Sequence, residues 1–472
     1  MAPAPDSPQR SVPLSALAPD GALPVEPRRG DPPPALRHLV SIDDLSVPQI
    51  EALFRLARGF SEDLRRHAHL CPGLISASLF YEPSTRTRLS FESAMLRLGG
   101  GVLTAADMQA SSAKKGESLA DTVRVVSGAY ADLIVLRHPS EGAARLAARA
   151  SSVPVINAGD GAHEHPTQTL CDLYTLWIEK GHLDGLDVVL AGDLRYSRTI
   201  HSFIFALARF RANVVCVPHQ GLELPDYVVK RLREEYGMEP IRADASRLGE
   251  LARESDAAYI TPQKPHQLSL FTDASGLKVE RVDAVYMTRP QTERFAKLED
   301  TRRYLKLGKQ QMAVDGLKEA VVMHPLPRRD ELSEDLDSDP RSLYFKQAAR
   351  GVPMRMAILA HLLGRVDLGA PGPAAEPGFY SLPEGPNLCA NPNCISRTED
   401  RHVRPAFRLL ARLPLRAACA FCEREFAPLW VGLRSERRYL APEALRARRW
   451  EPEDLVFFAQ ESEAHELGYA SS

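Results

Sequence analysis

Between residues 40 and 365 the chain alternates short, continuously apolar runs with longer amphipathic runs. The apolar runs predict strands buried on both faces, and the amphipathic runs predict helices covering those faces. This alternation is typical of doubly wound parallel sheets. The stretch is too long for one sheet, so we expect an α/β protein with two such domains, bridged by a helix over 166–180. The expected strands are 74–81, 101–103, 132–136, 153–156, 188–191 and 213–217, and the expected helices are 117–130, 143–150, 166–180, 198–210 and 227–236.

Length and composition limit the remaining possibilities. The 472 residues predict about three domains. With 59 basic and 61 acidic residues, the balanced charge gives no indication of a nucleic-acid or membrane partner. No apolar run approaches the roughly 20 residues that span a bilayer, and no signal-peptide pattern opens the chain. We therefore expect a cytoplasmic protein in which Cys71, Cys171 and Cys216 are buried core residues.

Composition shifts predict the domain boundaries. Residues 1–35 are rich in Pro and Ala and predict a disordered arm, and a Gly/Pro-rich linker is expected at 366–386. The first α/β domain is expected at 36–178, completed by a C-terminal helix near 345–365, and the second at 179–344. A small cysteine-containing β domain is expected at 387–435, followed by a tail at 436–472 to which the sequence assigns no role.

The segment after the first expected strand carries the most specific chemical signal. Ser84, Thr85, Arg86 and Thr87 stand at a strand-to-helix turn. A helix N-terminus offers backbone N–H donors and a partial positive charge, to which these side chains add further donors. The segment predicts a binding site for a dianion. The alternative, an ordinary Ser N-cap with solvated arginines, is the commoner reading of Ser-Thr-Arg alone.

Other expected strands also end in polar residues. Ligands of open parallel sheets bind beyond the carboxyl ends of the strands, so these residues are site candidates. They are Arg137, His165 and Gln168 in the first half, and Arg198, Arg289, Gln291 and the run His324-Pro325-Leu326-Pro327-Arg328 in the second. A small basic loop with Ser111 and Lys115 precedes the helix expected at 117–130.

These motifs, in this order, resemble the carbamoyltransferase family, and within it the catalytic chains of aspartate carbamoyltransferases, over about 40–365. They are Ser-Thr-Arg-Thr-Arg, Lys-Lys-Gly-Glu, Arg-His-Pro, His-Pro-Thr-Gln, Gly-Asp-Leu-x-Tyr-x-Arg-Thr, Thr-Arg-x-Gln and His-Pro-Leu-Pro-Arg. The resemblance implies transfer of the carbamoyl group of carbamoyl phosphate to L-aspartate in pyrimidine biosynthesis, giving N-carbamoyl-L-aspartate and phosphate. It implies a homotrimer with shared active sites and no organic cofactor.

The resemblance also implies a role for each candidate. Carbamoyl phosphate is bound by Ser84, Thr85, Arg86, Thr87, Arg137, His165, Gln168 and the backbone carbonyls of Leu326 and Pro327. Aspartate is bound by Lys115, Arg198, Arg289 and Gln291. The catalytic set is Arg86, Thr87, Lys115, Arg137 and His165. Ser111 and Lys115 belong to the loop that the family donates from a neighbouring subunit.

The chemistry suits these residue types. An acyl phosphate needs its dianion held by arginine and N–H donors. Its carbonyl must be polarised as a tetrahedral oxyanion forms, which suits Thr87, Arg137 and His165. A dicarboxylate nucleophile needs two guanidinium groups, which Arg198 and Arg289 supply. The substrate amine attacks directly, so no protein nucleophile is required.

Alternatives are an ornithine or other amino-acid carbamoyltransferase and an inactive scaffold of the same fold. Ornithine carbamoyltransferases carry Ser-Met-Gly and a cysteine in His-Cys-Leu-Pro, whereas this chain has Pro325 there and no Ser-Met-Gly. The intact set of basic residues argues against a scaffold. Residues 256–263 and 283–291 are near copies flanking an apparent insertion at about 262–282, and only the second copy places Arg289 before x-Gln.

Four cysteines near the C-terminus have the spacing of a metal site. Cys389 and Cys394, then Cys419 and Cys422, form two thiolate pairs that predict a structural Cys₄ zinc site. Free or disulfide-linked cysteines, or a zinc ribbon that binds nucleic acid, are the alternatives. The surrounding residues resemble the zinc domain of the aspartate carbamoyltransferase regulatory chain, which implies packing on catalytic subunits and higher assembly, without a nucleic-acid partner. That chain's nucleotide-binding domain has no room before Cys389.

Overall fold

The computed structural model describes residues 12–13, 38–106, 116–192, 194–195, 197–218, 223–242, 257–260, 284–286, 308–313, 321–324, 326–328, 332–369 and 379–472. Several sequence predictions lie outside these residues: those for Ser111, Lys115, Arg289, Gln291 and the insertion near 262–282. Of the arm expected at 1–35, only β1 (Val12–Pro13) is described, and it pairs with β12 (Val366–Asp367).

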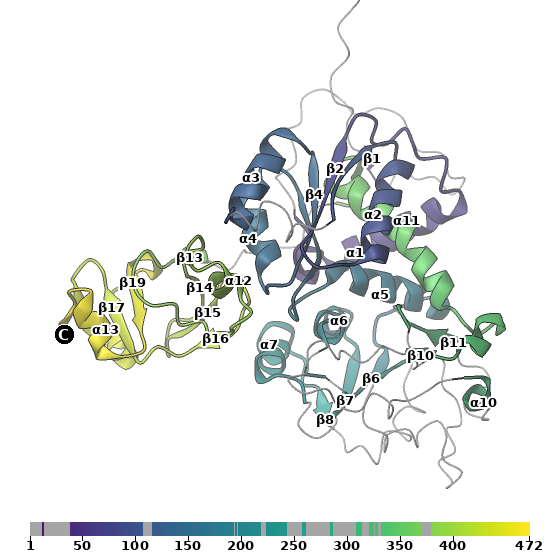
Figure 1. The fold of residues 1–472 in the computed structure, drawn as a ribbon. Coiled ribbons are helices and arrows are strands. Elements are labelled where there is room, and N and C mark those ends of the chain that lie inside the picture. Colours follow the sequence, from purple (N-terminus) through teal and green to yellow (C-terminus); the bar gives the residue numbers. More distant parts are fainter. Residues whose placement is uncertain are drawn as a thin grey trace, which may run out of the picture.

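The first α/β domain is built on a parallel four-stranded sheet. Its strand order is β3 (Gly101–Ala105), β2 (Ile75–Phe80), β4 (Leu133–His138) and β5 (Val155–Asp160). Helices α3 (Leu119–Ala129) and α4 (Ala143–Ala150) cover one face, and α1 (Val47–Glu62), α2 (Thr85–Arg97) and α11 (Tyr344–Leu362) cover the other (Figure 1). Both faces are therefore covered, which explains why every residue of β4 and β5 is buried.

The second α/β domain contains a parallel six-stranded sheet. Its order is β11 (Val321–Met323), β10 (Ala284–Tyr286), β9 (Ala257–Ile260), β6 (Asp187–Gly192), β7 (Asn213–Pro218) and β8 (Ile241–Arg242). It carries α6 (Arg198–Arg209), α7 (Asp226–Tyr236) and the short α10 (Lys309–Met312). The 3₁₀ helices η2 (Ile42–Asp44) and η10 (Glu334–Ser338) lie in connecting segments.

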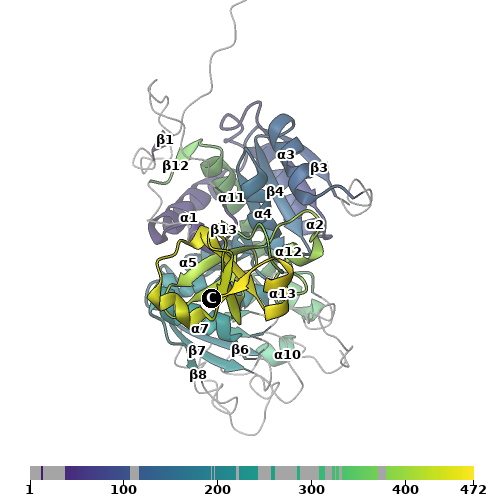
Figure 2. The same ribbon diagram turned by 90° about the vertical axis from the view of Figure 1, so that its left-hand side faces the viewer.

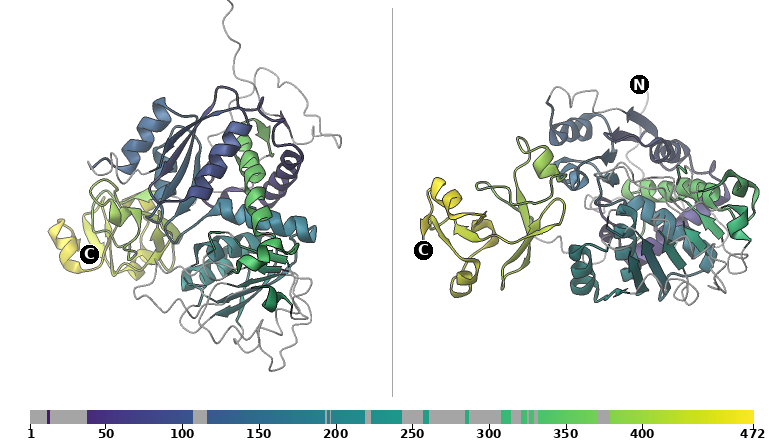
Figure 3. Two further views of the ribbon diagram at one scale, coloured as in Figure 1. Left: turned by 45° about the vertical axis from the view of Figure 1, so that its right-hand side comes forward. Right: turned by 60° about the horizontal axis from the view of Figure 1, so that its bottom comes forward.

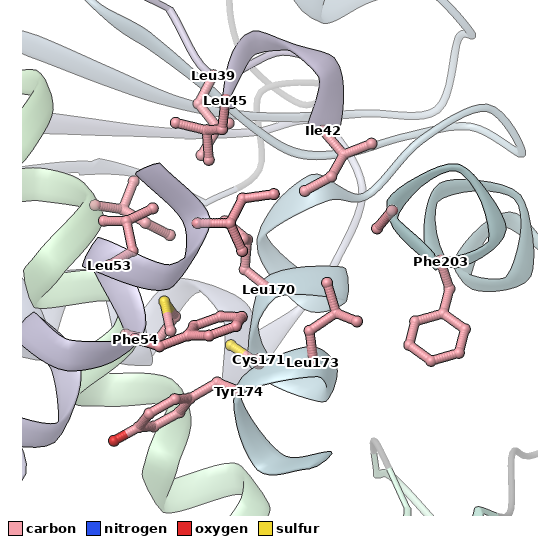
Figure 4. Packing of buried hydrophobic residues seen from close by; sticks show 14 of the residues in the cluster. Leu39, Ile42, Leu45, Leu53, Phe54, Leu170, Cys171, Leu173, Tyr174 and Phe203 are labelled. Carbon is pink, nitrogen blue, oxygen red and sulfur yellow. The ribbon is translucent and has the colours of Figure 1, made fainter. Parts of the chain in front are cut away.

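Helix α5 (Pro166–Lys180) joins the two α/β domains through a shared core. Proline in its first turn and Gly181, at φ 84°, after its last residue fix both ends. Figure 4 shows Leu170 and Leu173 of this helix between Phe54 of α1 and Phe203 of α6. All four side chains are buried in one cluster that extends into both domains. This common core sets the position of the two sheet rims relative to each other.

The C-terminal residues fold into two small sheets. One is antiparallel, in the order β13 (Phe379–Ser381), β14 (Ala406–Ala411), β15 (Arg416–Cys419) and β16 (Glu425–Phe426). The other has the order β19 (Leu455–Phe458), β17 (Trp430–Leu433), β18 (Arg438–Leu440) and β20 (Ala470–Ser471). The C-terminal residues also form four short helices: α12 (Ile395–Thr398), α13 (Glu461–Glu466), η11 (Pro442–Ala447) and η12 (Pro452–Asp454).

The two small sheets form one unit, residues 379–472, which we call the zinc module. Phe407 and Ala417 of the first sheet share a buried cluster with Val431, Leu440 and Phe457 of the second. The boundary predicted at 435 therefore falls between the paired strands β17 and β18. The residues predicted as a tail contribute the three strands β18, β19 and β20 to the second sheet. Their short apolar runs are separated by charged residues, so no periodic pattern predicted a sheet there.

The zinc module lies beside α4 and α7, against both α/β domains (Figures 1 and 2). Figure 3 shows that the end of the module with β17, β19 and α13 extends away from the two α/β domains. Phe421 and Ile395 of the module are buried in one cluster with Ala143, Ala144 and Ala147 of α4. The two parallel sheets and the small β domain confirm the predicted fold class, and every predicted strand and helix is present with ends shifted by a few residues.

Candidate active site

Three predicted site residues meet at the end of strand β5. Arg137 is the penultimate residue of β4, His165 is the N-cap of α5, and Arg198 is the first residue of α6. A Cβ placed on Gly159 would lie 3.1 Å from Arg137 Nη1, 3.3 Å from His165 Cδ2 and 3.4 Å from Arg198 Nη1. Gly159 has φ 113°, a backbone conformation that favours glycine, and a side chain there would crowd all three residues. The two α/β domains therefore contribute basic side chains to one point.

A carboxylate that the sequence analysis missed connects two of these side chains. Glu82 Oε2 lies 3.2 Å from Arg137 Nη2 and 3.6 Å from Arg198 Nη1. Each guanidinium also donates to a backbone carbonyl: Arg137 to Ala158 at 3.1 Å and Arg198 to Gly161 at 2.7 Å. These contacts fix both orientations. The only available sign of Glu82 was its position between an expected strand and the Ser-Thr-Arg segment.

The predicted dianion site borders the same point. Residue Phe80 of β2 is in register with Arg137 of β4, and Tyr81 N donates to Arg137 O at 2.8 Å. The chain then turns through Ser84, the N-cap of α2, so the N-terminus of this helix lies at the rim next to Arg137. Ser84 makes no side-chain capping bond to the helix backbone; its Oγ instead donates to Thr87 Oγ1 at 3.0 Å. A helix N-terminus in this position suits a phosphate.

A buried polar chain links α5 to the loop after β11. Gln168 Nε2 and Gln347 Nε2 both donate to Asp172 Oδ1, at 2.8 and 3.1 Å. Gln347 Oε1 accepts from His324 N at 2.9 Å, and Leu326 N donates to His324 Nδ1 at 2.8 Å. The loop carrying the predicted carbonyls of Leu326 and Pro327 is thereby tied to Gln168. Sequence analysis missed Asp172 and Gln347, which lie far apart in the chain.

Burial changes the pKa of two groups beside the site. It lowers the pKa of His138 to about 4, so the ring is neutral and its Nδ1 accepts a hydrogen bond from Ser140 N at 3.0 Å. It raises the pKa of Glu164 to about 7. Glu164 accepts from Ser41 Oγ at 2.8 Å and from Ser202 Oγ at 3.4 Å, and Ser202 Oγ also accepts from His165 N at 3.1 Å. The position of His165 thus depends on both domains.

The four predicted metal ligands converge in the zinc module. All are buried, and their Sγ atoms lie within 4.8 Å of one another. Tetrahedral zinc with Zn–S bonds of about 2.3 Å places sulfurs about 3.8 Å apart. Cys389 and Cys422 are 3.5 Å apart and Cys394 and Cys419 3.7 Å, far beyond a disulfide bond. Hydrogen bonding from Cys389 and the other thiols lowers the pKa of Cys394, which favours the ligating thiolate. The four cysteines hold a structural zinc.

A second cluster with metal-binding atoms is formed by His163, Glu164 and Glu423. It does not suit a cation, because the Glu423 carboxylate already contacts the guanidinium groups of Arg145, Arg231 and Arg408.

Among the described helices, none combines the length and apolar character needed to cross a bilayer.

Three family models match consecutive parts of the chain. Residues 37–178 match the aspartate/ornithine carbamoyltransferase carbamoyl-P binding domain, and residues 184–362 match the Asp/Orn binding domain of the same family. Residues 387–428 match the metal binding domain of the aspartate carbamoyltransferase regulatory chain. The third match ends before β17, so half of the zinc module lies beyond it.

Curated relatives and solved structures agree with these matches. The aspartate carbamoyltransferase catalytic subunit of Thermoplasma acidophilum is 44% identical over 341 residues, which is 70% of this chain and 98% of that protein. The Clostridium kluyveri catalytic subunit is 42% identical over 334 residues, with the same coverage. The M. jannaschii catalytic subunit has a TM-score of 0.55 and 41% identity, covering 69% of this chain and 98% of its own. The Trypanosoma cruzi enzyme in complex with N-(phosphonacetyl)-L-aspartic acid has a TM-score of 0.56 and 34% identity, covering 72% and 99%.

Proposed function

Because the chain belongs to the aspartate/ornithine carbamoyltransferase family, we propose that it transfers the carbamoyl group of carbamoyl phosphate to L-aspartate. One observation carries the proposal: Arg137, His165 and Arg198 converge on Gly159 at a rim shared by both domains. The relatives named above are aspartate carbamoyltransferases, and the regulatory-chain metal domain in the same chain favours aspartate over ornithine.

Carbamoyl phosphate would bind with its phosphate at the N-terminus of α2. Ser84, Thr85 and Arg86 would hold the dianion with backbone N–H groups of the first turn. Thr87, Arg137 and His165 would donate to the carbonyl oxygen, while Gln168 and the carbonyls of Leu326 and Pro327 would orient the carbamoyl NH₂. Donors fixed before the reaction stabilise the tetrahedral oxyanion without reorganisation.

The neutral amine of aspartate would attack the carbamoyl carbon. The C–N bond forms, the tetrahedral intermediate collapses, and the C–O bond to phosphate breaks. The departing phosphate accepts the amine proton, so atoms and charge balance without a protein nucleophile. Arg198, held by Gly161 O and Glu82, would pair with one aspartate carboxylate. Arg289, Gln291 and Lys115 would complete the aspartate site.

The active site would be shared within a homotrimer. Leu89 and Leu96 lie seven residues apart on α2 and are 51% and 60% exposed, and Leu103 on β3 is 45% exposed. Glu92 of α2 joins these elements by accepting from Thr104 Oγ1 of β3 at 2.8 Å. Because β3 is an edge strand, this apolar face suits another subunit. The segment with Ser111 and Lys115 follows β3 directly, and it would reach the neighbour's site.

The location and pathway belong to the same proposal. Cys71, Cys171 and Cys216 are buried free thiols, which suits the reducing cytoplasm. N-carbamoyl-L-aspartate would enter de novo pyrimidine biosynthesis. The zinc module would mediate assembly beyond the trimer.

The decisive experiment measures carbamoyl-amino-acid formation by the purified full-length chain. With carbamoyl phosphate present, L-aspartate should be carbamoylated, and L-ornithine, the control amine, should react hardly at all. The Arg289→Ala variant should lose aspartate affinity while its affinity for carbamoyl phosphate changes little, since one partner of a charge pair is removed. Equal turnover of ornithine would refute the proposal.

Mixed oligomers test the shared site. Lys115→Ala and Arg86→Ala proteins should each be nearly inactive. When they are dissociated, mixed and reassembled, activity should return, because some interfaces then join two unaltered halves. Verified mixed trimers without recovered activity would place the whole site within one chain.

A further inference from the structure

Glu423 of the zinc module lies at the junction of three parts of the molecule. It directly follows Cys422 and has φ 61°, in the left-handed region that residues with a side chain rarely adopt. Its side chain is only 9% exposed. Its carboxylate contacts charged groups of both α/β domains.

Three guanidinium groups surround this carboxylate. Arg145 Nη2 of α4 lies 3.0 Å from Oε1, and Arg231 Nη1 of α7 lies 3.1 Å from Oε2. Arg408 of β14, within the zinc module, also pairs with Oε1. One carboxylate thus connects the first α/β domain, the second α/β domain and the zinc module, and these side chains are largely withdrawn from solvent.

Glu423 also reaches the turn that carries His165. His163 Nε2 lies 3.5 Å from Glu423 Oε2, and His163 Nδ1 lies 3.1 Å from Asp160 Oδ2. Burial alone would lower the pKa of His163, but the charges of Asp160 and Glu423 outweigh it and hold that pKa well above its usual value. The imidazolium therefore donates to both carboxylates and joins them.

Asp160 in turn fixes the backbone around the site. Its carboxylate accepts from Gly142 N at 2.8 Å, Glu164 N at 3.1 Å and Asn157 Nδ2 at 3.0 Å. The turn at 159–165 contains Gly159, where the three site residues meet, and Gly161, whose carbonyl orients Arg198. The contact of Glu423 with His163, and that of His163 with Asp160, connect the zinc module to this turn.

We propose that Glu423 is a positioning residue for carbamoyl transfer, supplied to the catalytic turn by the zinc module of the same chain. It holds the His163–Asp160 pair and joins α4 to α7, so it fixes the turn at 159–165 and the approach of the two α/β domains. The inference rests on the proposed function. It assigns the module a direct part in the geometry of the site as well as a part in assembly.

Glu423→Gln tests the proposal, with Glu425→Gln as the matched control. Glu425 lies two residues further on and pairs with Lys230 of α7 and with Arg416, but it does not contact the turn. Small displacements of reacting groups cost up to about a hundredfold in rate, so we expect Glu423→Gln to lower kcat at least about tenfold. Zinc content should stay at that of the unaltered chain, and Glu425→Gln should keep its kcat and both KM values.

The catalytic-side variant His163→Asn tests the same path without altering the zinc module. It should also lower kcat, and the double variant His163→Asn/Glu423→Gln should be no slower than the slower single variant, because both interrupt one path. If Glu423→Gln releases zinc, its loss of kcat has a second cause, and the kcat of His163→Asn alone tests the proposal. Unchanged kcat in His163→Asn, or multiplicative losses in the double variant, would overturn the inference. An unaltered chain that does not carbamoylate aspartate would instead overturn the proposed function.

Discussion

Glu82 shows how a single carboxylate can set the geometry of two arginines. It lies between Arg137 and Arg198, which come from different domains. In Glu82→Gln the two guanidinium groups lose their shared counter-charge and repel each other, so Arg198 should leave its place beside Gly161. We expect kcat/KM for aspartate to fall by about 10- to 100-fold, as when one partner of a buried charge pair is removed. Initial rates measure this, and Glu62→Gln on the exposed end of α1 should behave like the unaltered chain.

Glu164 makes stability depend on pH. Burial raises its pKa in the folded chain to about 7, from 4.5 in the unfolded chain. Below pH 4.5 both states bind the proton and the group has no effect. As the pH rises from 4.5 to about 7, Glu164 ionises in the unfolded state before it ionises in the folded state. The free energy of unfolding therefore falls over this range, and the loss is complete above about pH 7. Glu164→Gln removes that loss. The variant's gain in thermal midpoint should be larger at pH 8 than at pH 5, and a gain independent of pH would contradict this assignment.

The sequence placed candidate site residues at a common rim only where local structure determines their position. Arg137, His165 and Arg198 stand at ends of strands or starts of helices, so the strand and helix pattern alone placed them at one rim. Glu82 and Glu423 were missed because their roles depend on contacts between segments remote in the chain. Nothing in the periodicity around either residue indicates which arginine will face it.

At the level of elements, α5 and α11 support the proposed carbamoyl site. Asp172 of α5 accepts from Gln168 and from Gln347 of α11, and Gln347 also accepts from His324 N. Helices were predicted at 166–180 and near 345–365, and the structure has them at Pro166–Lys180 and Tyr344–Leu362. The sequence did not predict the polar contact between them, because a hydrogen bond across 175 residues leaves no local pattern.

Gln347→Leu tests this support. The substitution keeps the side-chain volume but leaves His324 N and part of Asp172 without these bonds, at a cost of about 1–3 kcal/mol. The loop with Leu326 and Pro327 should loosen, so we expect KM for carbamoyl phosphate to rise and the thermal midpoint to fall. Steady-state kinetics and calorimetry measure both. Lys346→Ala, an exposed change on the same helix, should alter neither quantity. An unchanged KM in Gln347→Leu would show that these hydrogen bonds do not support carbamoyl phosphate binding.

At the scale of the whole molecule, the alternation of strands and helices was enough to predict two parallel sheets, and the cysteine spacing was enough to predict the zinc site. The extent of the zinc module was not predictable in the same way. Its second sheet consists of strands of two to four residues, too short for a periodicity to emerge. Its docking on α4 also depends on small residues, Ala143, Ala144 and Ala147, whose flat surface is visible only in three dimensions.

Removal of zinc should therefore act on the whole molecule. Binding of zinc to a Cys₄ site contributes roughly 10–16 kcal/mol of folding free energy, so Cys419→Ser should unfold at least the part of the module around the cysteines. Phe421 would then leave the alanine face of α4, and Glu423 would leave the turn at 159–165. We expect about one zinc per chain before the change and none after it, increased binding of a hydrophobic dye, and a loss of kcat as large as that of Glu423→Gln. The proposed trimer should persist, because the exposed face of α2 and β3 lies outside the module. Full activity in a zinc-free chain would show that the α/β domains hold their catalytic geometry without the module.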